Sequence, residues 1–78
     1  MDRKEILAHI DELVAEEHRL RGEGHALGED DRRRLREAEE HLDQLWDLLR
    51  RRDALRRAGQ DPDAAAEQSV PQVESYLQ

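Results

Sequence analysis

The sequence predicts an all-α protein: an antiparallel hairpin of two amphipathic helices, followed by a short, partly helical C-terminal tail. Apolar residues recur at steps of three and four in two long segments, which is the period of a helix with one buried face. A glycine-rich stretch, GEGHALGEDD, separates the two segments and interrupts this period.

The first helix is predicted over residues 2–21. Asp2 suits the N-cap position, and Glu5, three residues later, suits the reciprocal position of a capping box. Its apolar stripe consists of Ile6, Leu7, Ile10, Leu13, Val14 and Leu20. This stripe defines the face that the helix is expected to bury.

The second helix is predicted over residues 31–57, after a loop over residues 22–30. Asp30 or Asp31 suits its N-cap, and Gly59 suits the position just beyond its C-terminal end. The glycines of the loop offer helix-ending positions with positive φ: Gly22, Gly24 and Gly28. The apolar face of this helix holds Leu35, Ala38, Leu42, Leu45, Trp46, Leu48, Leu49 and Leu55.

Residues 58–78 are predicted to form an acidic tail outside the hairpin domain of residues 1–57. Asp61 followed by Pro62 is typical of a short helical turn, and Ser69 suits the cap of another. The apolar tail residues at helical spacing are Val70, Val73, Tyr76 and Leu77. They are expected to dock, either on the chain's own hairpin as a clamp or on a partner as a binding motif.

A hairpin of two helices cannot enclose an apolar face as wide as that of the second helix. Because the loop is short, the two helices are expected to be antiparallel neighbours. The simplest cover is a second copy, which gives a homodimeric four-helix bundle with coiled-coil-like packing. A monomer whose C-terminal segment folds back as a third element is the alternative.

Glu17 is a polar residue within the apolar stripe of the first helix. In a hairpin that turns near residues 25–26, it lies near Arg34, which also falls on the inner side of its helix. The sequence therefore predicts a partly buried Glu17–Arg34 pair near the closed end, within a chain or across the dimer. Such pairs often add little net stability, because the cost of desolvation offsets the attraction between the charges. This pair is therefore expected to fix the register of the two helices.

Composition excludes several classes of function. The chain has no cysteine, which removes disulfides, thiolate metal sites and a catalytic thiol. No apolar run approaches the roughly 18 residues of a membrane span, and the N-terminus lacks the apolar region of a signal peptide. The protein is therefore predicted to be soluble and cytoplasmic, with no membrane partner.

The histidines do not form a metal or catalytic motif. Di-metal helical bundles use Glu-x-x-His, but the residue three positions before each of His9, His18 and His41 is apolar. Glu at i−4 to His9 and His41 is an ordinary surface arrangement. With no nucleotide-binding glycine pattern and no serine beside a histidine in sequence, the expectation is no enzyme, no metal and no cofactor.

Arginine is concentrated on the second helix. Residues 32–57 carry nine arginines and six acids, so this helix is basic within a chain of net charge −7. The candidate anion or partner contacts are Arg50, Arg51, Arg52, Arg56 and Arg57. Such runs bind phosphate, so nucleic-acid association is the alternative function. Interleaved acids and the acidic chain favour a salt-bridged surface instead.

The leading prediction is therefore a non-enzymatic protein-interaction, scaffold or regulatory module that acts through homodimerisation. An unidentified protein partner is a further expectation, and the apolar residues of the two helices are the predicted core and dimer interface. The sequence does not indicate a pathway or a ligand.

The chain also resembles a family of small uncharacterised proteins from high-GC Gram-positive bacteria. The segments that carry the resemblance are ILAHIDELVAEEHRLR, LDQLWDLLRRRDALRRAGQDPD and VESYL. The most specific features are the run WDLLR at residues 46–50, then Arg52, Leu55 and the corner of Gly59, Asp61 and Pro62. The resemblance covers nearly the whole chain. It implies a helical domain of unknown function in a bacterial cytoplasm, without an activity, cofactor or catalytic residue.

Overall fold

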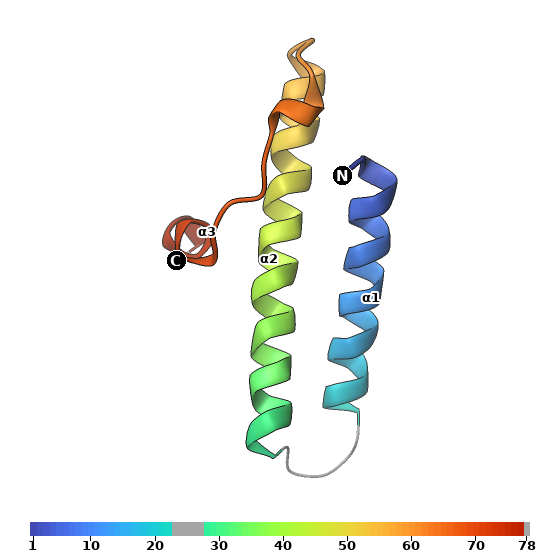
Figure 1. Ribbon diagram of the computed structural model, residues 1–78, viewed down its shortest axis with the longest axis vertical. Helices are drawn as coiled ribbons and strands as arrows, with labels where there is room; N and C mark the ends of the chain where they lie inside the picture. Colours follow the sequence, from blue (N-terminus) through green and yellow to red (C-terminus); the bar gives the residue numbers. More distant parts are fainter. Residues whose placement is uncertain (23–27, 78) are drawn as a thin grey trace.

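The protein is described by a computed structural model that covers residues 1–22 and 28–77, without the side chains of Tyr76 and Leu77. Its elements are α1 (Arg3–Arg21), α2 (Glu29–Arg57), the 3₁₀ helix η1 (Pro62–Ala64) and α3 (Val70–Leu77). Helices α1 and α2 lie side by side and antiparallel, and α3 lies on the side of α2 away from α1 (Figure 1). The predicted all-α hairpin with a short helical tail is confirmed.

The ends of α1 follow from its terminal residues. Asp2 has an extended backbone and accepts a hydrogen bond from the Glu5 amide at 2.8 Å, so it is the predicted N-cap and α1 begins one residue later. Gly22 ends the helix as expected, but its φ is −87°. The expectation of a positive φ at Gly22 was wrong, because its amide still bonds the His18 carbonyl at 2.9 Å in a helix-like turn.

Helix α2 begins two residues earlier than predicted. Gly28 occupies the N-cap position with a φ of −68° and no side-chain cap, so the expected caps at Asp30 or Asp31 and a positive φ at Gly28 were wrong. Asp30 and Asp31 lie in the first turn instead, where carboxylates stabilise the positive end of the helix dipole. Gly24 lies outside the described residues.

The chain leaves α2 through a Schellman motif at Gly59. Gly59 has a φ of +74°, as its predicted position requires. Its amide donates to the Arg56 carbonyl at 3.1 Å, and the Gln60 amide donates to the Leu55 carbonyl at 2.8 Å. Asp61 then accepts from the Asp63 amide at 2.9 Å and caps η1, which confirms the turn predicted from the Asp-Pro pair.

Residues 62–69, here called the strap, run back along α2. Side chains of α2 donate to strap carbonyls: Gln44 to Gln68 at 3.1 Å, Arg52 to Pro62 at 3.3 Å, and Arg51 to Ala66. Ser69 caps α3 through its hydroxyl, which accepts from the Gln72 amide at 3.4 Å. The tail therefore docks on its own hairpin, the clamp alternative.

The core is a single apolar cluster between α1, α2 and the strap. Its buried members are Ile6, Ile10, Leu42, Leu45, Leu48 and Leu49, with Leu7, Leu13, Val14 and Ala65 packed against them. Leu20, Ala38 and Val73 are also buried, whereas Leu35, Leu55 and Val70 are half-buried. The radius of gyration is 14.6 Å, against about 11.5 Å for a compact domain of this length. The molecule is therefore elongated, and its two long helices form one layer with two broad faces.

The predicted Glu17–Arg34 pair does not form within the chain. Glu17 is partly buried, as expected, but it lies 3.7 Å from Arg21 of its own helix, and Arg34 is exposed. The register of the two helices keeps these two residues apart within the chain. Arg21 pairs with Glu39, so Glu17, one turn earlier, is level with residues beyond Glu39 and about 13 Å along the axis from Arg34.

Candidate interaction surface

Ion pairs link α1 to α2 near both ends of the hairpin. Arg3 contacts both carboxylate oxygens of Asp53, at 2.8 and 2.9 Å. At the other end Arg21 donates to the Glu39 carboxylate. Leu7, Val14 and Arg21 follow one another at steps of seven, and so do Glu39, Trp46 and Asp53, so each set lies along one side of its helix. The ion pairs therefore place both sets on the same face of the hairpin.

This face, here called the open face, is apolar between its ion pairs. It consists of Leu7 and Val14 of α1 and Trp46 of α2, with Leu35 of α2 one turn beyond the Arg21–Glu39 pair. Trp46 is 42% exposed, although the sequence predicted it in the core or interface, and the other three are half-buried. The structure therefore brings part of the predicted interface together as a surface and buries most of the rest, whereas Leu13 and Leu55 are half-buried.

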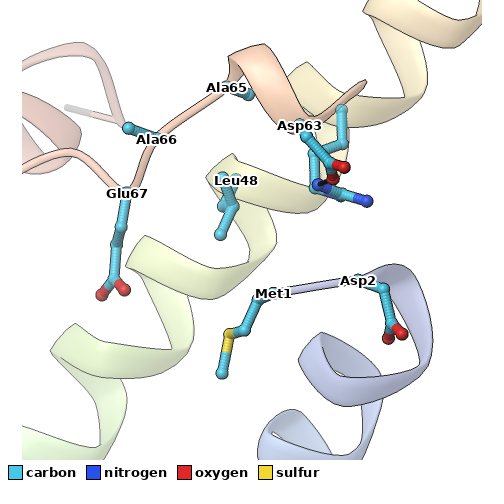
Figure 2. A pocket seen from close by; sticks show the side chains of 8 residues that line it. Met1, Asp2, Leu48, Asp63, Ala65, Ala66 and Glu67 are labelled. Atoms are coloured by element: carbon cyan, nitrogen blue, oxygen red, sulfur yellow. Dashed lines mark hydrogen bonds and ion pairs between the residues drawn. The ribbon is translucent and has the colours of Figure 1, made fainter. Parts of the chain in front are cut away.

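The opposite face of the hairpin is covered by the strap. Leu48 is buried there, and the N-terminal residues approach the strap across a shallow groove (Figure 2). The groove has a volume of about 420 Å³ and is lined by Met1, Asp2, Leu48, Arg52, Asp63, Ala65, Ala66 and Glu67. Its size is within the range of small-ligand pockets, but most of its lining residues are exposed, and three of the eight are acidic.

Arg52 contributes a guanidinium group to the groove, and the charge of this group is paired with a carboxylate of the same chain. Its side chain is nearly buried, and it donates to the Asp63 carboxylate at 2.7 Å. The hydrogen bond from Arg52 and its positive charge lower the pKa of Asp63 below its ordinary value of 3.8. Arg52 was predicted as an anion or partner contact, but in the structure it holds the strap.

The other predicted contact arginines are divided between internal and exposed positions. Arg51 donates to Asp47 at 3.0 Å as well as to the strap, and Arg57 donates to the Asp53 carbonyl at 3.4 Å. Arg50 and Arg56 are exposed and have no ion pair within the described part of the chain. The basic run is therefore partly structural.

Helix α3 meets α2 across a group of carboxylates. Val73 is fully buried at this contact, and the neighbouring Glu74 faces Asp43, with Glu40 nearby. One oxygen of Glu74 is buried and has no hydrogen-bond partner among the described residues. The facing Asp43 carboxyl, together with burial and the charge of Glu40, raises the pKa of Glu74 above its ordinary value of 4.5. The predicted tail contacts Tyr76 and Leu77 have side chains outside the described part.

Side chains able to bind a metal ion do not cluster in the described residues. His41 lies 3.7 Å from Glu67, a surface contact between α2 and the strap. Residues 1–22 and 28–77 contain no cluster of three or more His, Asp or Glu residues able to hold a metal ion. Within the same residues, no helix combines the length and apolarity needed to cross a membrane.

Sequence patterns missed the residues that fasten the strap. Asp47 and Arg52 are buried although both are charged, and Ala65 packs on the core from the strap. The corner from Gly59 to Pro62 is the signal that could have found them. A chain that reverses there returns along the last turns of α2, where Arg51 and Arg52 lie.

Comparison with known proteins places the chain in a family. Residues 2–78 match the family described as "Protein of unknown function (DUF2630)". The chain belongs to this family. DUF2630 relatives include the uncharacterized proteins Rv0898c of Mycobacterium tuberculosis and Mb0922c of Mycobacterium bovis. Each is 48% identical to the chain over 75 residues, covering 92% of the chain and 86% of the relative. The resemblance to uncharacterised proteins of high-GC bacteria is confirmed. No solved structure matches this DUF2630 chain.

Proposed function

We propose that this protein is a cytoplasmic, non-enzymatic interaction module that associates with a second copy of itself through the open face. The observation that carries the proposal is Trp46, which is 42% exposed in the middle of an apolar strip. Tryptophan is enriched among the residues that dominate binding energy at protein interfaces. An indole left this exposed on a small, highly charged protein is explained by a partner that covers it.

The arrangement of the hairpin supports the same proposal. The strap covers one face, and the open face has no covering element among the described residues. Soluble domains are ordinarily built from packed layers that enclose an apolar core between them. A second hairpin on the open face would supply the missing layer and complete a four-helix bundle.

The test is the native mass by light scattering, with a matched pair of variants. Trp46→Glu places a charge in the open face, whereas Ala15→Glu places the same charge at an exposed position on α1 outside that face. We expect a dimer for the wild type and for Ala15→Glu, and a monomer for Trp46→Glu. A wild type that stays monomeric at high concentration contradicts the proposal.

The nucleic-acid alternative has less support. Two of its five candidate arginines, Arg51 and Arg52, are engaged by the chain's own carboxylates and strap. The others lie beside interleaved acids on a chain of net charge −7. Gel retardation of DNA or RNA at low salt is expected to show no shift. A shift that weakens steeply with salt would restore this alternative.

A further inference from the structure

We infer that the second copy docks on the open face in a parallel orientation, so that each α2 lies along the partner's α1. The inference rests on the self-association proposed above. It adds the orientation of the two chains and names the residues that meet. The reasons are the order of charges along the open face and the position of Trp46 along the long axis of the hairpin.

Two hairpins stacked face to face with two-fold symmetry have two arrangements to choose from. If the symmetry axis runs along the helices, the chains are parallel and each α2 covers the partner's α1. If the axis runs across the helices, the chains are antiparallel, so that α1 covers the partner's α1 and α2 covers the partner's α2. Both arrangements pair neighbouring helices in opposite directions, so helix dipoles do not distinguish them.

The ion pairs show which residues of α1 and α2 lie at the same height along the hairpin axis, here called the same level. Arg3 is level with Asp53, and Arg21 is level with Glu39. Between these limits Trp46 stands level with the stretch between Leu7 and Val14. In the parallel arrangement each Trp46 therefore meets apolar side chains of the partner's α1, above and below it.

The charges at both ends of the face match in the parallel arrangement. Asp53 of one copy lies over the partner's Arg3, and Glu39 lies over the partner's Arg21. Each end then holds two arginines and two carboxylates in alternation, which is favourable because every charge has opposite neighbours. Ion pairs that are largely exposed in one chain become shared between two.

The same ends conflict in the antiparallel arrangement. Asp53 lies over the partner's Glu39, and Arg3 over the partner's Arg21, so like charges meet at both ends. Apolar contacts form in both arrangements: in the antiparallel one Trp46, midway between Glu39 and Asp53, lies over the partner's Trp46, and Leu7 lies near the partner's Val14. The charges therefore distinguish the two arrangements. Asp43 would form a favourable contact with the partner's Arg50. Like charges would nevertheless repel each other at both ends of the face. Juxtaposed like charges suppress the wrong pairing at interfaces.

The absence of cysteine allows a direct test by cross-linking. Four single variants are used: Leu7→Cys and Val14→Cys on the open face, and Asp43→Cys and Arg50→Cys about one turn of α2 on either side of Trp46. By level, Leu7 stands opposite the partner's Arg50 in the parallel arrangement, and Val14 stands opposite the partner's Asp43. Pairs of variants are mixed, re-equilibrated and oxidised, and the cross-linked dimers are identified on a non-reducing gel.

The four variants serve as controls for one another. We expect the mixtures Leu7→Cys with Arg50→Cys and Val14→Cys with Asp43→Cys to cross-link. Cross-linking instead of Leu7→Cys with Val14→Cys and of Asp43→Cys with Arg50→Cys would establish the antiparallel arrangement and overturn the inference. A dimeric wild type with neither pattern would also overturn it, since docking would then lie elsewhere.

A different result would contradict the proposed function: a wild type that is monomeric in light scattering. That result would also remove the basis of the inference.

Each variant is first checked for helix content by circular dichroism. If Leu7→Cys does not fold, Asp11→Cys replaces it, because Asp11 is exposed and lies one turn further along α1. Cross-linking of Asp11→Cys with Arg50→Cys then carries the same expectation.

Discussion

The two faces of the hairpin have similar apolar sequences but different surroundings. On one face the strap lies beside Leu48 and receives hydrogen bonds from α2. On the other face Trp46 stands 42% exposed between ion pairs. Leu45 and Trp46 are adjacent in sequence, yet Leu45 is fully buried. The difference shows that one short tail can complete one face of a two-helix layer and leaves the other for a second molecule.

The largest effect is expected from Leu45→Ala in the apolar core. The side chain is fully buried, so its truncation should cost about 2–5 kcal/mol in unfolding free energy. That is a large part of the roughly 5–15 kcal/mol typical of small domains. Urea unfolding measures it, with Trp46→Ala as the neighbouring comparison. Trp46→Ala should chiefly reduce the dependence of stability on protein concentration. Equal losses of unfolding free energy from both variants would show that the two positions contribute equally to the stability of one chain.

Arg52→Met tests the fastening of the strap. The variant keeps most of the buried stem but removes the hydrogen bonds to Pro62 and Asp63, so unfolding free energy should fall by about 1.5–3 kcal/mol. Faster amide exchange in residues 62–69 should accompany the loss. Arg56→Met is the matched control, because Arg56 is exposed, and it should change stability by less than about 0.5 kcal/mol.

Gly59→Ala tests the turn that sends the chain toward the covered face. A Cβ at Gly59 meets no atom within 4 Å, so the cost comes from its φ of +74° and should be about 1 kcal/mol in thermal unfolding. Gly59→Asn should cost less, because asparagine tolerates this backbone region better than alanine does. A larger loss for asparagine than for alanine would contradict the backbone explanation.

The smallest effect is expected from pH at the contact of α3. The raised pKa of Glu74 means that the folded state binds this proton more tightly than the unfolded state does. Stability should therefore rise as pH falls from 7 through the folded pKa, and the rise is complete below about 4.5. Asp63 acts in the opposite direction: its contribution is present above 3.8 and is lost as pH falls through its lowered folded pKa.

Thermal unfolding between pH 7 and pH 3 measures both contributions, and a maximum is expected near pH 4–5. Glu74→Gln should remove the rise on the acidic side of neutrality and raise the melting temperature at pH 7. Glu12→Gln, at an exposed position on α1, should leave the rise in place. A rise that persists in Glu74→Gln would show that another group causes it.

Local signals predicted most of the fold, and pairing between distant residues was predicted less well. The Asp2 cap, the Gly59 turn and the Ser69 cap depend on neighbours within a few residues, so sequence spacing sufficed for them. The Glu17–Arg34 pair required the relative height of two helices. An error of two residues in the start of α2, together with the assumed turn centre, moved the partners more than two helical turns apart.

The sequence by itself determined the helices, their apolar stripes and the points where they end, because hydrophobic period, capping and glycine conformation are local properties. Only the tertiary structure decided which face the tail covers. It also decided that Arg51 and Arg52 bind the strap and that Trp46 remains at the surface. The physical reason is that an apolar stripe does not specify what will cover it. The path of the strap from Gly59 onward and the register set by Arg3–Asp53 and Arg21–Glu39 make that choice.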